Sequence, residues 1–271
     1  MCCLSVMQPE GSRYFPKKLV DAAIISRCCE KTNLVHAGTP TQRIPCDIYI
    51  AVDPASHQRS SMGLVAMFYG TSGEVVILGL ASVSAEKCDV VQIQMVIGSF
   101  VDDILRHLWL RQRFRTMQAR VVPIIECNSN EILAMSILDA MKRAAQRGKA
   151  VVGMPFNKAI FGSGVSDGIG VWTTDRNKLA GIQSVYTCLL DNRIRFAHGF
   201  VVVGEVYRNG SNTPSPNETR QLLATQLKNV RDLPSGKVSG KTSSEASPSG
   251  VVDLCKLANV ISPIEPYRRM I

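Results

Sequence analysis

The sequence lacks the marks of a membrane, secreted or zinc-binding protein. No uncharged apolar run is long enough to span a bilayer, and the start, "MCCLSVMQPEGSRYFPKK", lacks the apolar core of a signal peptide. Nine cysteines are present, but no two are spaced as C-x-x-C, and the adjacent pairs have no histidine at zinc spacing. We therefore expect reduced thiols in a cytosolic or nuclear protein and no cysteine-based metal site.

Acidic residues are the scarcer charged type. The 271 residues include 31 Lys and Arg but only 22 Asp and Glu, which gives a net charge of +9. Such an excess suits a polyanion, either nucleic acid or an anionic membrane surface, although a soluble protein can also be basic without binding either. The 45% hydrophobic and 20% charged content are globular values.

Apolar runs and helical periodicity predict an α/β fold. Strands are expected at 48–53, 63–70, 74–83, 120–126, 150–154 and 194–206, the second and third forming a hairpin around Thr71-Ser72-Gly73. Helices are expected at about 89–115, 130–148, 174–192, 217–230 and 253–261. Strands joined through helices imply parallel pairing and a sheet covered on both faces. Residues 1–46 read as a lead-in or linker, residues 47–271 as the domain, and residues 234–250 as a flexible basic loop within it.

Two of the expected strands end in an acid, Asp53 and Glu126. In an open α/β sheet, ligands gather at the carboxyl ends of the strands. If these two strands are neighbours, the carboxylates lie about 5 Å apart and repel one another unless a hard divalent cation joins them. A third carboxylate, Asp253 at the head of the last helix, could complete a site for two ions about 4 Å apart, which suits phosphodiester hydrolysis.

Each acid also has a simpler interpretation. An Asp before a Pro, as in Asp53-Pro54, commonly forms a turn. Glu126 could belong to the rim of a loop, and Asp253 could be a helix N-cap. The spacing of the three acids alone does not decide between these interpretations and a metal site.

Four segments carry a resemblance to a known family. In order, "IYIAVDPA", "SMGLVAMF", "VVPIIECNSNE" and "SGVVDLCKLANVI" resemble the C-terminal nuclease domain of the herpesvirus-type terminase large subunit, which cuts concatenated viral genomes during packaging. The resemblance covers roughly residues 47–262. It implies an RNase H-like fold, a mixed sheet flanked by helices, in which the first strand is central and the fourth lies beside it. It also implies that Asp53, Glu126 and Asp253 are the catalytic residues and the ligands of two Mg²⁺ or Mn²⁺ ions.

The sequence departs from the family pattern in three places. The family's acidic pair is Val252-Asp253 here, so a fourth carboxylate is missing unless Glu245 or Asp167 replaces it. The family's glycine after the glutamate is Cys127. The ATPase motor that precedes the nuclease in these subunits has no counterpart in this sequence.

Candidate DNA-binding residues are basic. The family's Gly-Lys segment matches either Gly236-Lys237 or Gly240-Lys241, and Lys237 and Lys241, with Arg113 and Arg115, are the residues we expect to contact DNA phosphates. The run "GKVSGKTSS" is not a phosphate-binding P-loop, because three residues instead of four separate its glycines and no apolar strand precedes it. Basic residues also concentrate at 106–120 and 142–149, where solvated helix ends explain them equally well.

Together these features predict a metal-dependent DNA endonuclease with little sequence specificity, because nothing resembles a groove-reading helix. The resemblance implies double-stranded DNA as substrate, the host nucleus as location, no membrane, and a terminase ATPase motor segment, a terminase small subunit and a portal as partners. Two alternatives stay open. One is a non-catalytic DNA-binding or packaging-scaffold protein with a degenerate nuclease fold. The other is a different RNase H-like enzyme, such as a resolvase or an RNase H.

Overall fold

The computed structural model describes most of the expected core. It describes residues 12–25, 46–54, 62–69, 74–83, 89–106, 119–127, 131–148, 150–152, 165–166, 170–171, 175–203, 216–232 and 238–239. The strands are β1 Ser12–Arg13, β2 Cys46–Asp53, β3 Met62–Tyr69, β4 Val75–Val83, β5 Ala119–Ile125, β6 Val151–Val152, β7 Val165–Ser166, β8 Gly170–Val171, β9 Ile194–Val203, β10 Arg231–Asp232 and β11 Val238–Ser239. The helices are α1 Lys17–Val20, the π-helix η1 Asp21–Ile25, α2 Val90–Arg106, α4 Glu131–Arg147, α6 Asp175–Leu190 and α7 Pro216–Asn229.

Six of the described strands form one mixed sheet in the order β6-β5-β2-β3-β4-β9. β3 pairs antiparallel with both β2 and β4, which confirms the expected hairpin. β5 is parallel to β2, β6 is parallel to β5, and β9 is parallel to β4. The first strand of the sheet is therefore internal, and the strand after the first long helix lies beside it, as expected.

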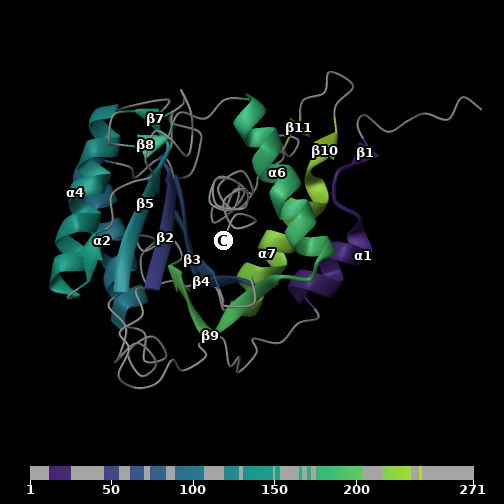
Figure 1. The fold of residues 1–271 in the computed structure, drawn as a ribbon, viewed down its shortest axis with the longest axis horizontal. Coiled ribbons are helices and arrows are strands. Elements are labelled where there is room, and N and C mark those ends of the chain that lie inside the picture. Colours follow the sequence, from purple (N-terminus) through teal and green to yellow (C-terminus); the bar gives the residue numbers. More distant parts are fainter. Residues whose placement is uncertain are drawn as a thin grey trace, which may run out of the picture.

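Helices cover both faces of this sheet. Figure 1 shows α2 and α4 on one side and α1, α6 and α7 on the other. Coverage of both faces explains why β3, "MGLVAMFY", is apolar along its length and buried at every position except Tyr69. The predicted α/β class, a mixed sheet flanked by helices, is confirmed. Among the described residues, no helix is both long and apolar enough to cross a bilayer.

The helices α2 and α4 lie side by side and point in the same direction. Near their N-termini, Gln94 Nε2 donates to Ser136 Oγ at 2.5 Å, and near their C-termini Arg147 Nη2 donates to Asp102 Oδ2 at 2.8 Å. Asp89 caps α2, as the sequence predicts, because its Oδ1 accepts from the N–H of Gln92 at 2.7 Å. Both helices lead from the carboxyl end of one strand back to the amino end of the next.

The segment before the sheet is folded where the structure describes it. β1 pairs with β10, and Phe15 and Val20 are fully buried in the core. The buried Arg220 of α7 donates from Nε and Nη2 to the carbonyl of Ile24, at 2.9 and 2.5 Å. Residues 12–25 therefore pack onto the domain, although the sequence suggested a lead-in over 1–46. The domain boundary at residue 46 stays a prediction.

The basic loop expected at 234–250 also has a described part. Its residues Val238–Ser239 form β11, which pairs with β10 beside β1. At this point the chain is tied to the N-terminal segment by a small three-stranded sheet.

A left-handed residue ends α6. Asn192 has φ 59°, the N–H of Arg193 donates to the carbonyl of Cys188 at 2.8 Å, and the N–H of Asn192 donates to that of Leu189 at 3.1 Å. This is the bonding pattern of a Schellman motif with Asn at the position that glycine usually takes. The turn leads directly into β9, which begins at Ile194. The N–H of Val75 in β4 donates to the carbonyl of Arg193, so the pairing of β4 with β9 begins at this turn.

The first prediction concerns this turn. Asn192→Val should lower the free energy of unfolding by about 1–2 kcal/mol, because a β-branched side chain disfavours positive φ. Asn192→Gly should leave stability unchanged or raise it slightly. Urea denaturation of the three proteins measures this, and equal midpoints for Val and Gly would contradict it.

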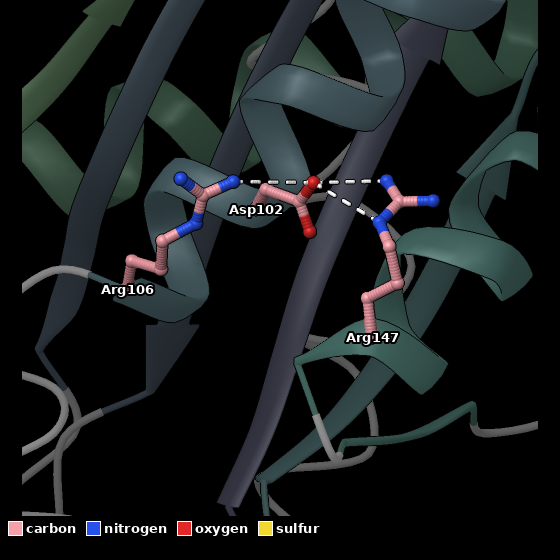
Figure 2. A network of polar contacts seen from close by, with 3 residues as sticks. All are labelled: Asp102, Arg106 and Arg147. Atoms are coloured by element: carbon pink, nitrogen blue, oxygen red, sulfur yellow. Dashed lines mark hydrogen bonds and ion pairs between the residues drawn. The ribbon is translucent and has the colours of Figure 1, made fainter.

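A shared carboxylate joins the C-terminal ends of α2 and α4. Figure 2 shows Asp102 between two arginines: Arg147 lies at 2.8 Å and Arg106, one turn further along α2, at 3.4 Å from the same Oδ2. The Asp102 side chain is only 13% exposed, whereas the two arginines are more than half exposed. The pair between helices has the shorter distance and two hydrogen bonds from Arg147.

The second prediction separates the two contacts. Asp102→Asn should destabilise the protein by about 1–2 kcal/mol, because two charge-assisted hydrogen bonds from Arg147 and the ion pair with Arg106 lose their charged acceptor. Arg106→Ala should cost at most about 0.5 kcal/mol, as expected for an exposed pair one turn apart. Denaturant melts check both predictions. Equal losses of stability in the two variants would show that the contact between Arg147 and Asp102 adds no stability beyond that of the exposed pair.

Candidate functional site

Asp53 and Glu126 lie side by side at the carboxyl ends of neighbouring strands. β2 and β5 are parallel with Val52 opposite Ile125, and the N–H of Glu126 donates to the carbonyl of Val52 at 2.9 Å. The next residue of each strand is therefore Asp53 and Glu126. Residues opposite one another in a parallel pair share a face of the sheet, and neighbouring strands are about 5 Å apart. The sequence analysis made a metal site conditional on these two strands being neighbours, and the structure meets this condition for Asp53 and Glu126.

The two acids occupy the more accessible face of β2. Side chains alternate along a strand, so Tyr49, Ala51 and Asp53 share one face, and Ile48, Ile50 and Val52 share the other. Ile48 and Ile50 are fully buried, whereas Asp53 and Glu126 are only half-buried. Solvent, and an ion carried by it, can therefore reach the carboxylate pair.

A glycine lies opposite Asp53 on its other side. In the antiparallel pair of β2 and β3, Asp53 faces Gly63, which is buried. Any other residue there would place a side chain about 5 Å from that of Asp53 on the same face. Gly63 therefore keeps side-chain atoms away from the carboxylate on the β3 side. Sequence reasoning missed this residue, although a glycine inside an apolar strand is a signal of close approach.

A second glycine contacts the end of β5. A Cβ on Gly170 of β8 would lie 2.2 Å from the carbonyl oxygen of Ile125 and 2.4 Å from the sulfur of Cys127. Cys127 is buried, and its thiol lies 3.7 Å from that same carbonyl. Cys127 is thus accommodated against a glycine, Gly170. Gly170 holds β8 directly beside the strand that carries Glu126.

Three arginines, Arg106, Arg120 and Arg147, lie at the other end of the sheet. Arg120, at the start of β5, forms two hydrogen bonds of 2.6 Å with Asp47, and this bonding raises the pKa of Arg120 above its ordinary value although burial opposes it. Six residues of strand separate Arg120 from Glu126, a distance of about 20 Å. Arg106 and Arg147 share Asp102 at the C-termini of α2 and α4, on the same side as Arg120. All three are held in ion pairs away from the carboxylates.

Several expected site residues lie outside the described residues. These are Asp253, Lys237, Lys241, Arg113 and Arg115, and the substitute acids Glu245 and Asp167 lie outside them as well. Within the described ranges, no group of three or more His, Cys, Asp or Glu residues is placed to hold a metal ion. The structure therefore places two of the three expected ligands together and leaves the third as a prediction.

The two placed carboxylates suit a hard divalent cation. Carboxylate oxygens are the protein ligands that Mg²⁺ and Mn²⁺ prefer, and Mg²⁺ is commonly bound by one or two carboxylates with water and substrate phosphates completing its shell. The half-buried setting of the two acids and the absence of a side chain at Gly63, opposite Asp53, are compatible with such a shell.

Comparisons with known proteins identify the fold. No protein-family model matches the sequence, and no curated protein sequence matches it. Among solved structures, the human cytomegalovirus terminase nuclease domain soaked with Mn is similar, with a TM-score of 0.52 and 12% identity over 78% of this chain and 80% of that one. The inhibitor-bound, Mn-soaked form of that domain gives 0.50 and 12% identity over 68% of this chain and 74% of that one.

These likenesses confirm the resemblance read from the sequence motifs. At such low identity they show the fold and not the activity. The mixed sheet with an internal first strand, β5 beside it and helices on both faces confirms the RNase H-like class. The chain has the fold of the herpesvirus terminase nuclease domain.

Proposed function

We propose that this chain is a divalent-metal-dependent DNA endonuclease domain of a viral genome-packaging terminase. The observation that carries the proposal is the parallel register of β2 and β5, which puts Asp53 and Glu126 on one face at one end of the sheet. The fold shared with a terminase nuclease domain supports it. Double-stranded DNA is the proposed substrate, and the net charge of +9 favours a polyanion.

The proposed site uses Mg²⁺ or Mn²⁺, two ions by the chemistry of phosphodiester cleavage. When bound, such ions supply Lewis acidity to both the attacking and the leaving oxygen. Asp53, between Glu126 and Gly63, is the residue best placed to be shared by two ions, and Glu126 would hold one of them. Asp253 is proposed as the third ligand.

The remaining parts of the proposal rest on the terminase likeness. Lys237, Lys241, Arg113 and Arg115 are proposed to contact DNA phosphates. An ATPase motor segment, a terminase small subunit and a portal are the proposed partners, and the host nucleus is the proposed location. Arg106, Arg120 and Arg147 are paired with acids at the far end of the sheet, so these three are not proposed to contact DNA near the carboxylates.

The third prediction tests the carboxylates. With supercoiled plasmid and Mn²⁺, wild type should produce nicked and linear DNA, and Asp53→Asn and Glu126→Gln should each lower the rate at least about 100-fold, since even residues that only support metal ligands cost 10- to 100-fold. Asp47→Asn is the matched control. It removes a carboxylate from the same face of β2, but at the end paired with Arg120, and should keep activity.

Titration of Mn²⁺ by calorimetry supplies an independent readout. Wild type and Asp47→Asn should bind, and Asp53→Asn should bind weakly or not at all. Plasmid that stays intact while DNA binding and fold are retained would favour the non-catalytic scaffold. Cleavage confined to four-way junctions or RNA–DNA hybrids would favour another RNase H-like enzyme.

The fourth prediction tests the space beside Asp53. Gly63→Ala should weaken Mn²⁺ binding and cleavage by about 10-fold, because the added methyl group occupies the space next to the carboxylate. Gly98→Ala is the control, since its added Cβ would make only an ordinary contact, 3.5 Å from Arg147 Nη2. Thermal melts check that both variants fold. If Gly63→Ala folds and binds Mn²⁺ like wild type, the proposed role of Gly63 is wrong.

A further inference from the structure

The exposed large apolar side chains of the described residues gather in one place. Six such side chains are exposed, and five of them belong to the N-terminal turns of α2 and α4. These five, which we call the α2–α4 platform, are Val90 at 50% exposure, Val91 at 65%, Met95 at 59%, Ile132 at 80% and Met135 at 51%. The sixth, Leu190, is at the end of α6. Single exposed apolar residues are ordinary, but a cluster of five marks an interaction surface.

The packing of the two helices joins these side chains into one surface. Gln94 and Ser136 form a hydrogen bond of 2.5 Å across the helix pair, and they are the chain neighbours of Met95 and Met135. Val91 precedes Gln94 by three residues, and Ile132 precedes Ser136 by four, so both lie beside this contact. Because α2 and α4 run in the same direction, their N-terminal turns present their apolar residues together.

The charges around the platform are acidic. Asp89 and Glu131, exposed at the starts of the two helices, form an acidic rim. Asp139, exposed two turns into α4, lies 4.0 Å from Lys142 and marks its limit. Residues 89–99 and 131–141 contain no Lys or Arg, whereas the C-terminal halves of the helices carry Arg106, Lys142, Arg143 and Arg147. In a chain of net charge +9, this is an apolar surface with an acidic rim. Such a surface repels nucleic acid and suits a cationic protein segment.

We propose that the α2–α4 platform docks a basic amphipathic helix of a partner protein. The apolar face of that helix packs on the platform, and its Lys and Arg residues face the acidic rim, the common mode by which an amphipathic helix binds an apolar groove. Ile132 is six residues from Glu126, so the chain allows at most about 20 Å between them. The docked helix would therefore lie at the same end of the sheet as the carboxylate pair. The proposal does not depend on nuclease activity.

The experiment uses methionine methyl groups as reporters. The whole chain, labelled with ¹³C at the methionine methyls, is titrated with a synthetic helical peptide of Leu and Lys whose leucines repeat at i, i+3, i+4 and i+7. The resonances of Met95 and Met135 should shift, and those of the buried Met62, Met67 and Met141 should not. A peptide with the same leucines and Glu in place of Lys should bind at least about 10-fold more weakly.

Variants localise the binding. Met95→Gln combined with Met135→Gln should weaken the Lys peptide at least about 10-fold without changing the thermal melt, since both positions are exposed. Leu190→Gln makes a similar change at an exposed position outside the platform and should leave binding unchanged. Equal binding of the Lys and Glu peptides, or binding that survives the double variant, would overturn the proposal. Dimerisation that the double variant abolishes, seen by sedimentation, would instead assign the platform to a second copy of the chain.

Discussion

The register between β2 and β5 is the constraint on which the site depends. A slip of one residue in either strand would move its terminal acid to the opposite face of the sheet, away from its partner. The register is fixed by burial, since Ile48, Ile50 and Ile125 are almost completely buried. The bond from Glu126 N–H to the Val52 carbonyl continues the pairing to the last position. Apolar packing thus holds two like charges together, an arrangement that a divalent cation stabilises.

The two ends of the sheet carry different kinds of residues. Because β2, β4 and β5 are parallel and α2 and α4 return in the opposite direction, Asp53, Glu126 and the N-termini of both helices lie at one end of the sheet, and three arginine–aspartate contacts lie at the other. At the amino end of the strands, Arg120 is paired with Asp47, and Arg106 and Arg147 share Asp102. These contacts fasten strand to strand and helix to helix. The carboxyl end keeps its carboxylates half-buried and is bordered by Gly63 and Gly170.

Local sequence signals predicted most of the helices and strands. The contacts between elements that are distant in the sequence could not be predicted in this way. Asp89 correctly predicted the start of α2, and Thr71-Ser72-Gly73 predicted the hairpin. The acids at the ends of 48–53 and 120–126 could be recognised from the sequence alone. Which strands are neighbours came from the family resemblance, because periodicity does not encode strand order. The position of Gly63 opposite Asp53 needs the antiparallel register, and the pairing of Arg147 with Asp102 needs the contact between two helices. The packing of residues 12–25 was missed because its strand and helix are too short to give a periodic signal.

The central claim is that Asp53 and Glu126 jointly bind a divalent cation, and anomalous scattering from a crystal grown with Mn²⁺ tests it most directly. The account predicts an anomalous peak about 2.0–2.6 Å from a carboxylate oxygen of each residue. Mn²⁺ bound elsewhere, with these two side chains turned away from one another, would contradict it.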